Sequence, residues 1–250
     1  MRAQDFVTEI ERLRTGDYQG GKDDINLFVH QSKGLTPLPG GSRYLYNITG
    51  NKQRPMIVIW DPEGADADPV VPQPIGRVNL DSAERVVPLP GALQVGTITV
   101  DEDYRGQGIA RALYGIVLAV MRRPLIAGEG QTPGGRRNWI GLSQIPGVEV
   151  RGWVAIFDDY LNPNYAPEWE TKSASKKIQA DAANMIDTLM GKLGAEYIGK
   201  NAINEHVFAF DVRPGRSEKE LEAVIKTELS RVYNEPTNVS TGLLATWTGA

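Results

Sequence analysis

The segment from Asp101 to Tyr114 is the part of the sequence whose residue types and spacing best suit chemistry. An apolar run ends at Val100, two closely spaced glycines follow, and a periodic apolar pattern begins at Ile109. Glycines let a backbone turn sharply and approach a ligand without an obstructing Cβ. The first turn of a helix leaves N–H groups unpaired at the positive end of its dipole. The segment therefore predicts an anion site, most naturally for phosphate; the competing interpretation is a bare strand-to-helix turn.

Hydrophobic periodicity predicts the elements that must position this turn. Apolar residues recur at helical spacing over 109–120, and Pro124 ends the pattern. Ahead of this helix the sequence predicts a helix at 3–14, loops at 15–42 and 63–74, and strands at 44–48, 56–60, 75–80 and 94–100. After it come a short strand at 125–127, a helix near 134–144, strands near 148–156, 207–212 and 243–247, and helices at about 175–193 and from Ser217. Gly194 is placed to end the helix before it in a left-handed conformation.

The turn and its flanks resemble the signature of the GNAT acyltransferases over about 20 residues. That family is marked by Gln/Arg-x-x-Gly-x-Gly/Ala, which Arg105, Gly108 and Ala110 satisfy, with Val100 as the usual apolar residue at the strand end. The order of elements from about 43 to 156 fits the same fold. The stretch 131–150 also resembles acetyltransferases found in bacteriophages.

The resemblance implies a GNAT-type α/β fold, in which a mixed, mainly antiparallel sheet with a splayed central strand pair is flanked by helices. We expect one domain over 1–250, with its core at 43–156 and 206–212, a helical insertion at about 158–205 and a helix–strand extension at 213–250. The strand at 243–247 is expected at the sheet edge, where it would be able to pair across a homodimer.

The resemblance also implies direct transfer of an acyl group from acetyl-CoA to a small-molecule or peptide amine. The diphosphate of acetyl-CoA would be held by the backbone after Arg105, namely that of Gly106, Gln107, Gly108, Ile109 and Ala110, together with Arg111. The pantetheine arm would pair with Ile98, Thr99 and Val100. The thioester would lie in the gap between that strand and residues 125–126.

The sequence does not indicate which residues would carry out catalysis at such a site. Family members often place a tyrosine acid on the helix after the splayed strand, where this sequence offers Trp139, which we expect to pack in a core. Ser143 and Tyr114 are the remaining candidates, and Tyr104 is expected to pack. The alternative function is therefore a non-catalytic binding or assembly protein that keeps the fold, for example within a virion.

Two other glycine patterns compete with this interpretation. Gly106-x-Gly108-x-x-Arg111, with Glu129 about 20 residues later, resembles a dinucleotide fingerprint, but five residues separate Val100 from the first glycine and the last position is not small. Residues 194–201 approach a P-loop, but Asn201 stands where a hydroxyl is needed and a helix precedes the segment.

Composition limits the remaining classes. The 250 residues carry a net charge of −4, 41% hydrophobic residues, two histidines and no cysteine. The lack of cysteine excludes disulfides, zinc sites built on thiolates and cysteine nucleophiles, and we expect no metal site. The mild acidity argues against a nucleic-acid partner. Because we find neither a secretory signal nor an apolar run of 18 residues, we expect no membrane partner and a location in the cytoplasm, which for a viral protein means the host cytoplasm or the virion.

Overall fold

The computed structural model describes residues 34–64, 72–128, 133–156, 194–211 and 239–249, with a few single positions between 184 and 227. The chain divides into two compact units, Met1–Asp81 with Gln94–Arg122 and Ser82–Leu93 with Arg123–Ala250. Each unit is a set of mainly antiparallel strands with few helices, so the fold class is mixed α/β. The single domain over 1–250 stays a prediction. The helix predicted at 3–14 and most of those at 175–193 and from Ser217 fall outside the described residues.

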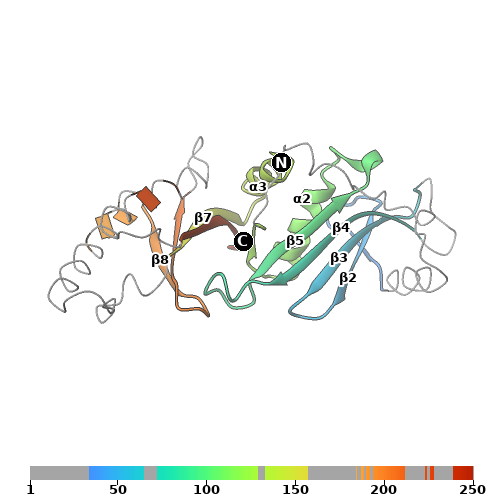
Figure 1. Cartoon of the computed structure of the whole chain (residues 1–250). Coiled ribbons are helices and arrows are strands. Elements are labelled where there is room, and N and C mark those ends of the chain that lie inside the picture. Colours follow the sequence, from blue (N-terminus) through green and yellow to red (C-terminus); the bar gives the residue numbers. More distant parts are fainter. Residues whose placement is uncertain are drawn as a thin grey trace, which may run out of the picture. The chain divides into compact units, whose positions relative to one another are not determined.

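The first unit contains five strands that neighbour one another in chain order (Figure 1). They are β1 (Thr36–Pro37), β2 (Leu45–Gly50), β3 (Pro55–Asp61), β4 (Gln73–Ser82) and β5 (Leu93–Val100). The β2–β3 and β3–β4 pairs are antiparallel, and the second is irregular between Ile59 and Trp60. The predicted strands at 44–48, 56–60, 75–80 and 94–100 are confirmed. The loop predicted at 63–74 ends earlier because β4 begins at the buried Gln73, and β1 lies inside the predicted loop at 15–42.

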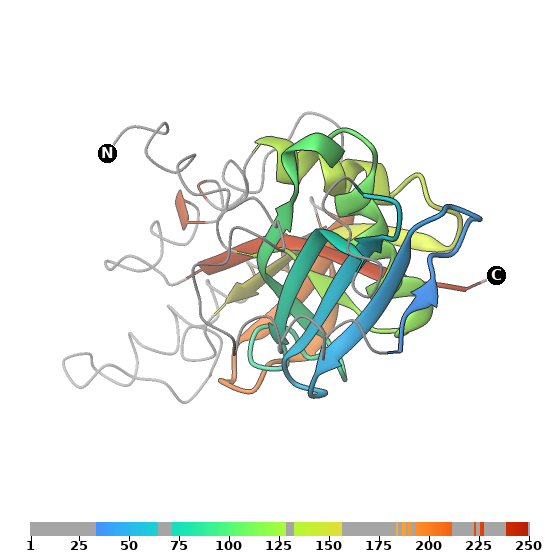
Figure 2. The same cartoon turned by 90° about the vertical axis from the view of Figure 1, so that its right-hand side faces the viewer.

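The helix predicted at 109–120 is present and follows β5 through a short 3₁₀ turn, η1 (Glu102–Tyr104). It consists of α2 (Ile109–Gly115) and a π-helical continuation, η2 (Ile116–Val120). Its apolar stripe faces the interior, since Ile109, Leu113 and Val117 are buried. The helix lies on the strands of its own unit (Figure 2). The approach is close: a Cβ at Gly76 of β4 would lie 2.5 Å from Cγ2 of Ile109.

The second unit has the strand order β6–β10–β7–β9–β8. These strands are β6 (Leu125–Ile126), β7 (Val148–Ile156), β8 (Glu196–Lys200), β9 (His206–Asp211) and β10 (Val239–Trp247), with α3 (Pro133–Leu142) between β6 and β7. The strands predicted at 125–127, 148–156 and 207–212 and the helix near 134–144 are confirmed within a few residues. All four pairings are antiparallel. Gly194 has a φ of 63°, the left-handed conformation predicted for it.

Two expectations about this unit are wrong. The last strand does not lie at a sheet edge, because β10 pairs with β7 along its whole length and with β6 at Leu244 and Ala245. The buried run Leu243–Ala245 is what a central strand requires. The region 158–205 is also not wholly helical, because β8 lies within it and pairs with β9.

The core of the second unit gathers around Trp153, Ile126 and Leu244, all at most 4% exposed. Ala155 and Val207, with no solvent exposure, complete the same cluster. Within the described residues, no helix is long and apolar enough to cross a membrane.

Candidate functional site

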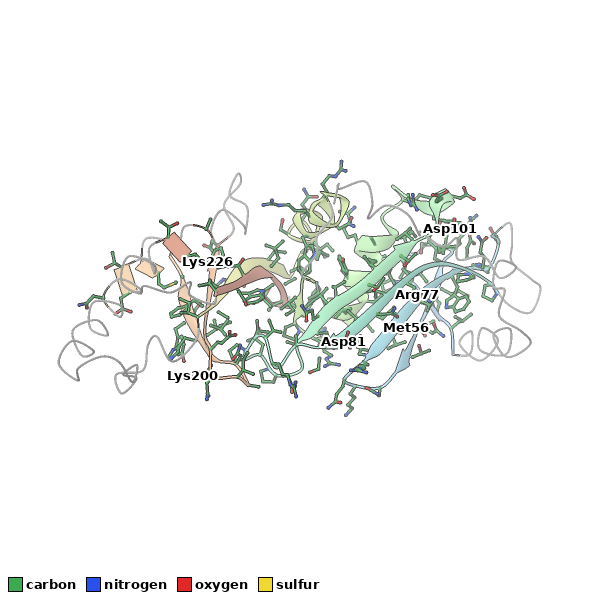
Figure 3. All side chains as sticks on the ribbon, viewed as in Figure 1. Met56, Arg77, Asp81, Asp101, Lys200 and Lys226 are labelled. Carbon is green, nitrogen blue, oxygen red and sulfur yellow. The ribbon has the colours of Figure 1, made fainter. Side chains whose placement is uncertain are left out.

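The anion site predicted from the sequence corresponds to the turn between β5 and α2, which lies entirely within the first unit. Figure 3 labels Asp101 at the end of β5, where its side chain accepts a hydrogen bond from the Asp103 N–H at 3.0 Å. Its own N–H donates to the carbonyl of Ile75 in β4 at 3.0 Å. Asp101 therefore starts η1 and ties the turn to the neighbouring strand.

The two glycines of the turn adopt a conformation that other residues rarely take. Gly106 has a φ of 78° and Gly108 a φ of 82°, while Arg105 between η1 and the glycines is extended. A Cβ built on either glycine would have no heavy atom of the described residues within 4 Å. The glycines are thus required by backbone conformation and not by crowding, and the space beside them is open. We call the segment from Arg105 to Gly108 the glycine turn.

The main-chain donors at the start of α2 are unpaired in the described part of the chain. The first hydrogen bond of the helix runs from the Ala112 N–H to the Gly108 carbonyl at 2.9 Å, and no side chain caps the helix start. The described backbone hydrogen bonds use none of the N–H groups of Gly106, Gly108, Ile109, Ala110 and Arg111. Free donors next to open space are the arrangement that binds a phosphate at a helix start.

The side chains around these donors differ in exposure. Arg105, Gln107 and Arg111 are exposed, and Arg105 Nη1 lies 3.3 Å from Glu102 Oε1. Ile109 is buried at 3% exposure and therefore contributes to the site through its backbone alone. The residues expected to pair with pantetheine, Ile98, Thr99 and Val100, form the last three positions of β5. The structure thus brings the predicted residues together along one strand end and one helix start.

A buried carboxylate that the sequence did not single out lies against the turn. Asp61, at the end of β3, has no solvent exposure. Its Oδ2 accepts hydrogen bonds from the Tyr104 hydroxyl at 2.9 Å and from Arg43 Nη2 at 2.7 Å, and its Oδ1 accepts from the Glu63 N–H at 2.9 Å. Tyr104 is the last residue of η1, so this contact joins β3 to the glycine turn.

A second contact reaches the residue between the two glycines. The Tyr44 hydroxyl donates to Gln107 Oε1 at 3.1 Å, and Gln107 Nε2 donates to the Asp103 carbonyl at 3.0 Å. The rings of Tyr44 and Tyr104 meet edge to face, with centroids 6.3 Å apart. We call Tyr44, Asp61, Tyr104 and Gln107 the Asp61 cluster. The only signal for it in the sequence is the position of Tyr44 and Asp61 at strand ends, which does not reveal a contact between distant segments.

Burial and hydrogen bonding shift three pKa values near the turn. Burial, followed by the hydrogen bond to Asp61, raises the pKa of Tyr104 from 10.0 to about 12. Burial raises the pKa of Tyr114 to about 12. The hydrogen bond to Asp61 is the main cause that raises the pKa of Arg43. At neutral pH both tyrosines therefore keep their protons, and Tyr104 remains a donor to Asp61.

The residues considered for acid catalysis belong to different elements of the two units. Trp139 lies in α3 with 2% exposure, which confirms the predicted core position. Tyr114 is buried in the first unit with 2% exposure, and Ser143 is exposed just after α3 in the second unit. Tyr104 packs and hydrogen-bonds as described above. The described residues contain no group of His, Cys, Asp or Glu side chains that would hold a metal ion.

The P-loop alternative does not agree with the structure. Residues 196–200 form β8, and Asn201 is buried and closes the turn toward β9. Its Oδ1 accepts from the N–H groups of Ile203 at 3.2 Å and Glu205 at 2.9 Å. Glu129, the residue that favoured a dinucleotide fingerprint, lies outside the described residues. In that fingerprint the strand leads straight into the first glycine, whereas η1 intervenes here.

Comparison with known proteins adds little to this site. No family model and no curated protein matches the chain. A solved structure similar to it is a candidate acetyltransferase from the GNAT family of Bacteroides thetaiotaomicron, with 11% identity and a TM-score of 0.24 over 79% of this chain and 77% of that chain. A TM-score of this size does not establish a shared fold.

Proposed function

We propose that the protein is an acetyl-CoA-dependent N-acetyltransferase of the GNAT type, which moves an acyl group directly to a primary amine. The observation that carries the proposal is the glycine turn. It combines the Arg-x-x-Gly-x-Ala spacing of Arg105, Gly108 and Ala110 with open space and unpaired amides at the start of α2. A diphosphate is the chemical group that such a set of amides suits best.

The residues present fit the diphosphate and the arm of this cofactor. The N–H groups of Gly106 and of residues 108–111 would donate to the diphosphate oxygens, whereas the Gln107 N–H already donates to the Tyr104 carbonyl at 3.4 Å. No Cβ at Gly106 or Gly108 blocks the approach of the diphosphate. The exposed guanidinium groups of Arg105 and Arg111 would add positive charge. The backbone of 98–100 would pair with the amide groups of the pantetheine arm in the manner of an added strand.

When bound, acetyl-CoA supplies an acetyl group activated as a thioester. The chain contributes binding and orientation, which raise the effective concentration of the acyl group beside the acceptor. An ammonium group must lose a proton before its nitrogen attacks, so the reaction needs a base or an ordered water. The acceptor in this proposal is a small-molecule or peptide amine.

Titration with acetyl-CoA tests the proposal. A ligand that binds the native state stabilises it by about 2.7 kcal/mol at a concentration of 100 times Kd, so the melting temperature must rise. Release of free thiol with a panel of amines then tests transfer. The absence of a thermal shift at millimolar acetyl-CoA would refute the proposal. Binding without thiol release from any amine would instead favour a non-catalytic binding protein.

A further inference from the structure

The glycine turn lacks the packing that usually holds a binding loop in place. Within the described ranges, no atom lies within 4 Å of a Cβ position on Gly106 or Gly108, and both residues have the conformational freedom of glycine. A loop of this kind loses conformational entropy when it binds a ligand, unless other contacts already fix it. The side chains of two residues beside these glycines, Tyr104 and Gln107, provide such contacts.

Tyr104 is fixed from the side of β3. Its hydroxyl donates to Asp61 Oδ2 at 2.9 Å, although 43 residues separate the two in the chain. Asp61 is itself held, because Arg43 Nη2 lies 2.7 Å from the same oxygen and the Glu63 N–H donates to the other. The fully buried carboxylate is therefore a rigid anchor for the end of η1, directly before Arg105.

Gln107 is fixed at both ends of its side-chain amide. Its Nε2 donates back to Asp103 in η1, and its Oε1 accepts from Tyr44, which lies 63 residues away in the chain. The edge-to-face contact of Tyr44 with Tyr104 joins the two attachments. Side chains from two distant segments thus hold the turn on either side of Gly106.

We infer that Tyr104 and Tyr44 are positioning residues that keep the glycine turn in its anion-binding conformation, with Asp61 as their anchor. The inference rests on the proposed function, because it assigns these residues to the same diphosphate site. Removing the hydroxyl of Tyr104 or Tyr44 leaves all the main-chain N–H donors present but lets the glycine turn sample other conformations. Ordering about one extra residue on binding corresponds to an affinity loss of about five- to 30-fold.

The test compares tyrosine-to-phenylalanine variants that remove single hydroxyl groups. Tyr104→Phe and Tyr44→Phe are measured by calorimetry with CoA, with inorganic pyrophosphate and with acetyl-pantetheine, which lacks the diphosphate. Tyr46→Phe is the matched control. Tyr46 is a buried tyrosine of β2 that pairs with Ile59 of β3, and it belongs neither to the glycine turn nor to the Asp61 cluster. Melting temperatures are recorded for all three variants.

We expect both cluster variants to bind CoA and pyrophosphate about five- to 30-fold more weakly. Their affinity for acetyl-pantetheine should be unchanged, and the control should bind all three ligands like the wild type. A merely structural role would weaken all three ligands together, in step with the melting temperature, and would overturn the inference. Unchanged CoA and pyrophosphate affinities would overturn it too. If Tyr104→Phe does not fold, Tyr44→Phe decides, since Tyr44 is only half-buried.

The probes separate this inference from the proposed function. Wild-type protein that binds pyrophosphate but not CoA contradicts the acetyl-CoA proposal, and weaker pyrophosphate binding by the variants then still supports the positioning role. Wild-type protein that binds neither probe overturns both. Wild-type protein that binds CoA, with variants that bind it equally well, overturns the positioning role alone.

Discussion

Replacing Gly108 by alanine is expected to change two quantities by different amounts: the stability of the folded chain and the affinity of the glycine turn for CoA. Gly108 has a φ of 82° and a ψ of 6°, in the left-handed region. Holding a residue with a Cβ in that region costs about 1–2 kcal/mol. No heavy atom among the described residues lies within 4 Å of the added Cβ, so none of them adds a clash to this cost. A loss of about 1 kcal/mol lowers the melting temperature of a chain of this size by about 2–4 °C.

The effect of Gly108→Ala on binding is expected to be larger. An N–H donor must come within about 2.9 Å of a phosphate oxygen to hydrogen-bond to it, and the new methyl group occupies the open space beside the donors. Each hydrogen bond to a charged group contributes about 1.5–3 kcal/mol. Losing one of them weakens CoA binding by about 10- to 100-fold. Isothermal calorimetry with CoA measures this change.

Gly34→Ala is the matched control for this prediction. Gly34 lies in the same unit and has a φ of 72°, and no atom in the described part of the chain lies within 4 Å of its Cβ position. It is expected to lower the melting temperature by a similar amount and to leave the CoA affinity unchanged. Equal loss of stability in both variants with full CoA affinity in both would refute the assignment of the glycine turn as the anion site.

Three further changes test the surroundings of the turn. Glu102→Gln frees Arg105 from its carboxylate partner at 3.3 Å, and calorimetry at low salt should show CoA binding about two- to fivefold tighter. Gly76→Ala places a Cβ 2.5 Å from Cγ2 of Ile109, so urea unfolding should show a free energy of unfolding that is lower by about 1–3 kcal/mol. Calorimetry should show weaker binding of CoA. The pKa of Tyr104 is about 12 in the folded chain and 10.0 ordinarily, so the unfolded chain loses this proton at lower pH than the folded chain. The stability of the wild type should therefore fall as pH rises from about 10 to about 12. The fall in stability should be smaller in Tyr104→Phe.

Each of these three predictions has a result that contradicts it. A tighter CoA complex of Glu102→Gln that persists unchanged at high salt would show that electrostatic release of Arg105 is not the cause. Full stability of Gly76→Ala would mean that α2 does not depend on its close approach to β4. An identical fall in melting temperature above about pH 10 for the wild type and Tyr104→Phe would mean that another group titrates there.

The sequence was sufficient for elements whose signal lies in consecutive residues. The strands β2 to β5 and the helix at 109–120 could be predicted from the spacing of their apolar residues and from the Gly, Pro and Asp residues that bound them. The glycine turn could be located for the same reason, because its conformation needs glycine at two specific positions. Its unpaired amides follow from being at the start of a helix, whatever the rest of the chain does.

The order of strands in the second unit was not accessible in this way. Whether a run such as 243–247 lies at an edge or in the middle depends on which other strands pair with it, and that is set by contacts between distant segments. The strand β8 is hard to predict because its five residues include Gly199 with a φ of 128°, and they lack the uninterrupted apolar alternation of a typical strand.

The Asp61 cluster shows what this limit means for a binding site. The groups that would touch a ligand are local and readable, whereas the groups that hold them are 43 and 63 residues away. Arg43 cannot be read as a further anion ligand, because its charge is balanced by Asp61 at 2.7 Å and Glu63 at 3.2 Å.

Arg105 is likewise paired with Glu102 at 3.3 Å, so the positive charge of this arginine is partly balanced. Together with the exposed Arg111, the oriented N–H groups at the start of α2 would attract an anion, and the contribution of these N–H groups does not depend on net charge. A mildly acidic chain, with a net charge of −4, is therefore compatible with a diphosphate site at this turn.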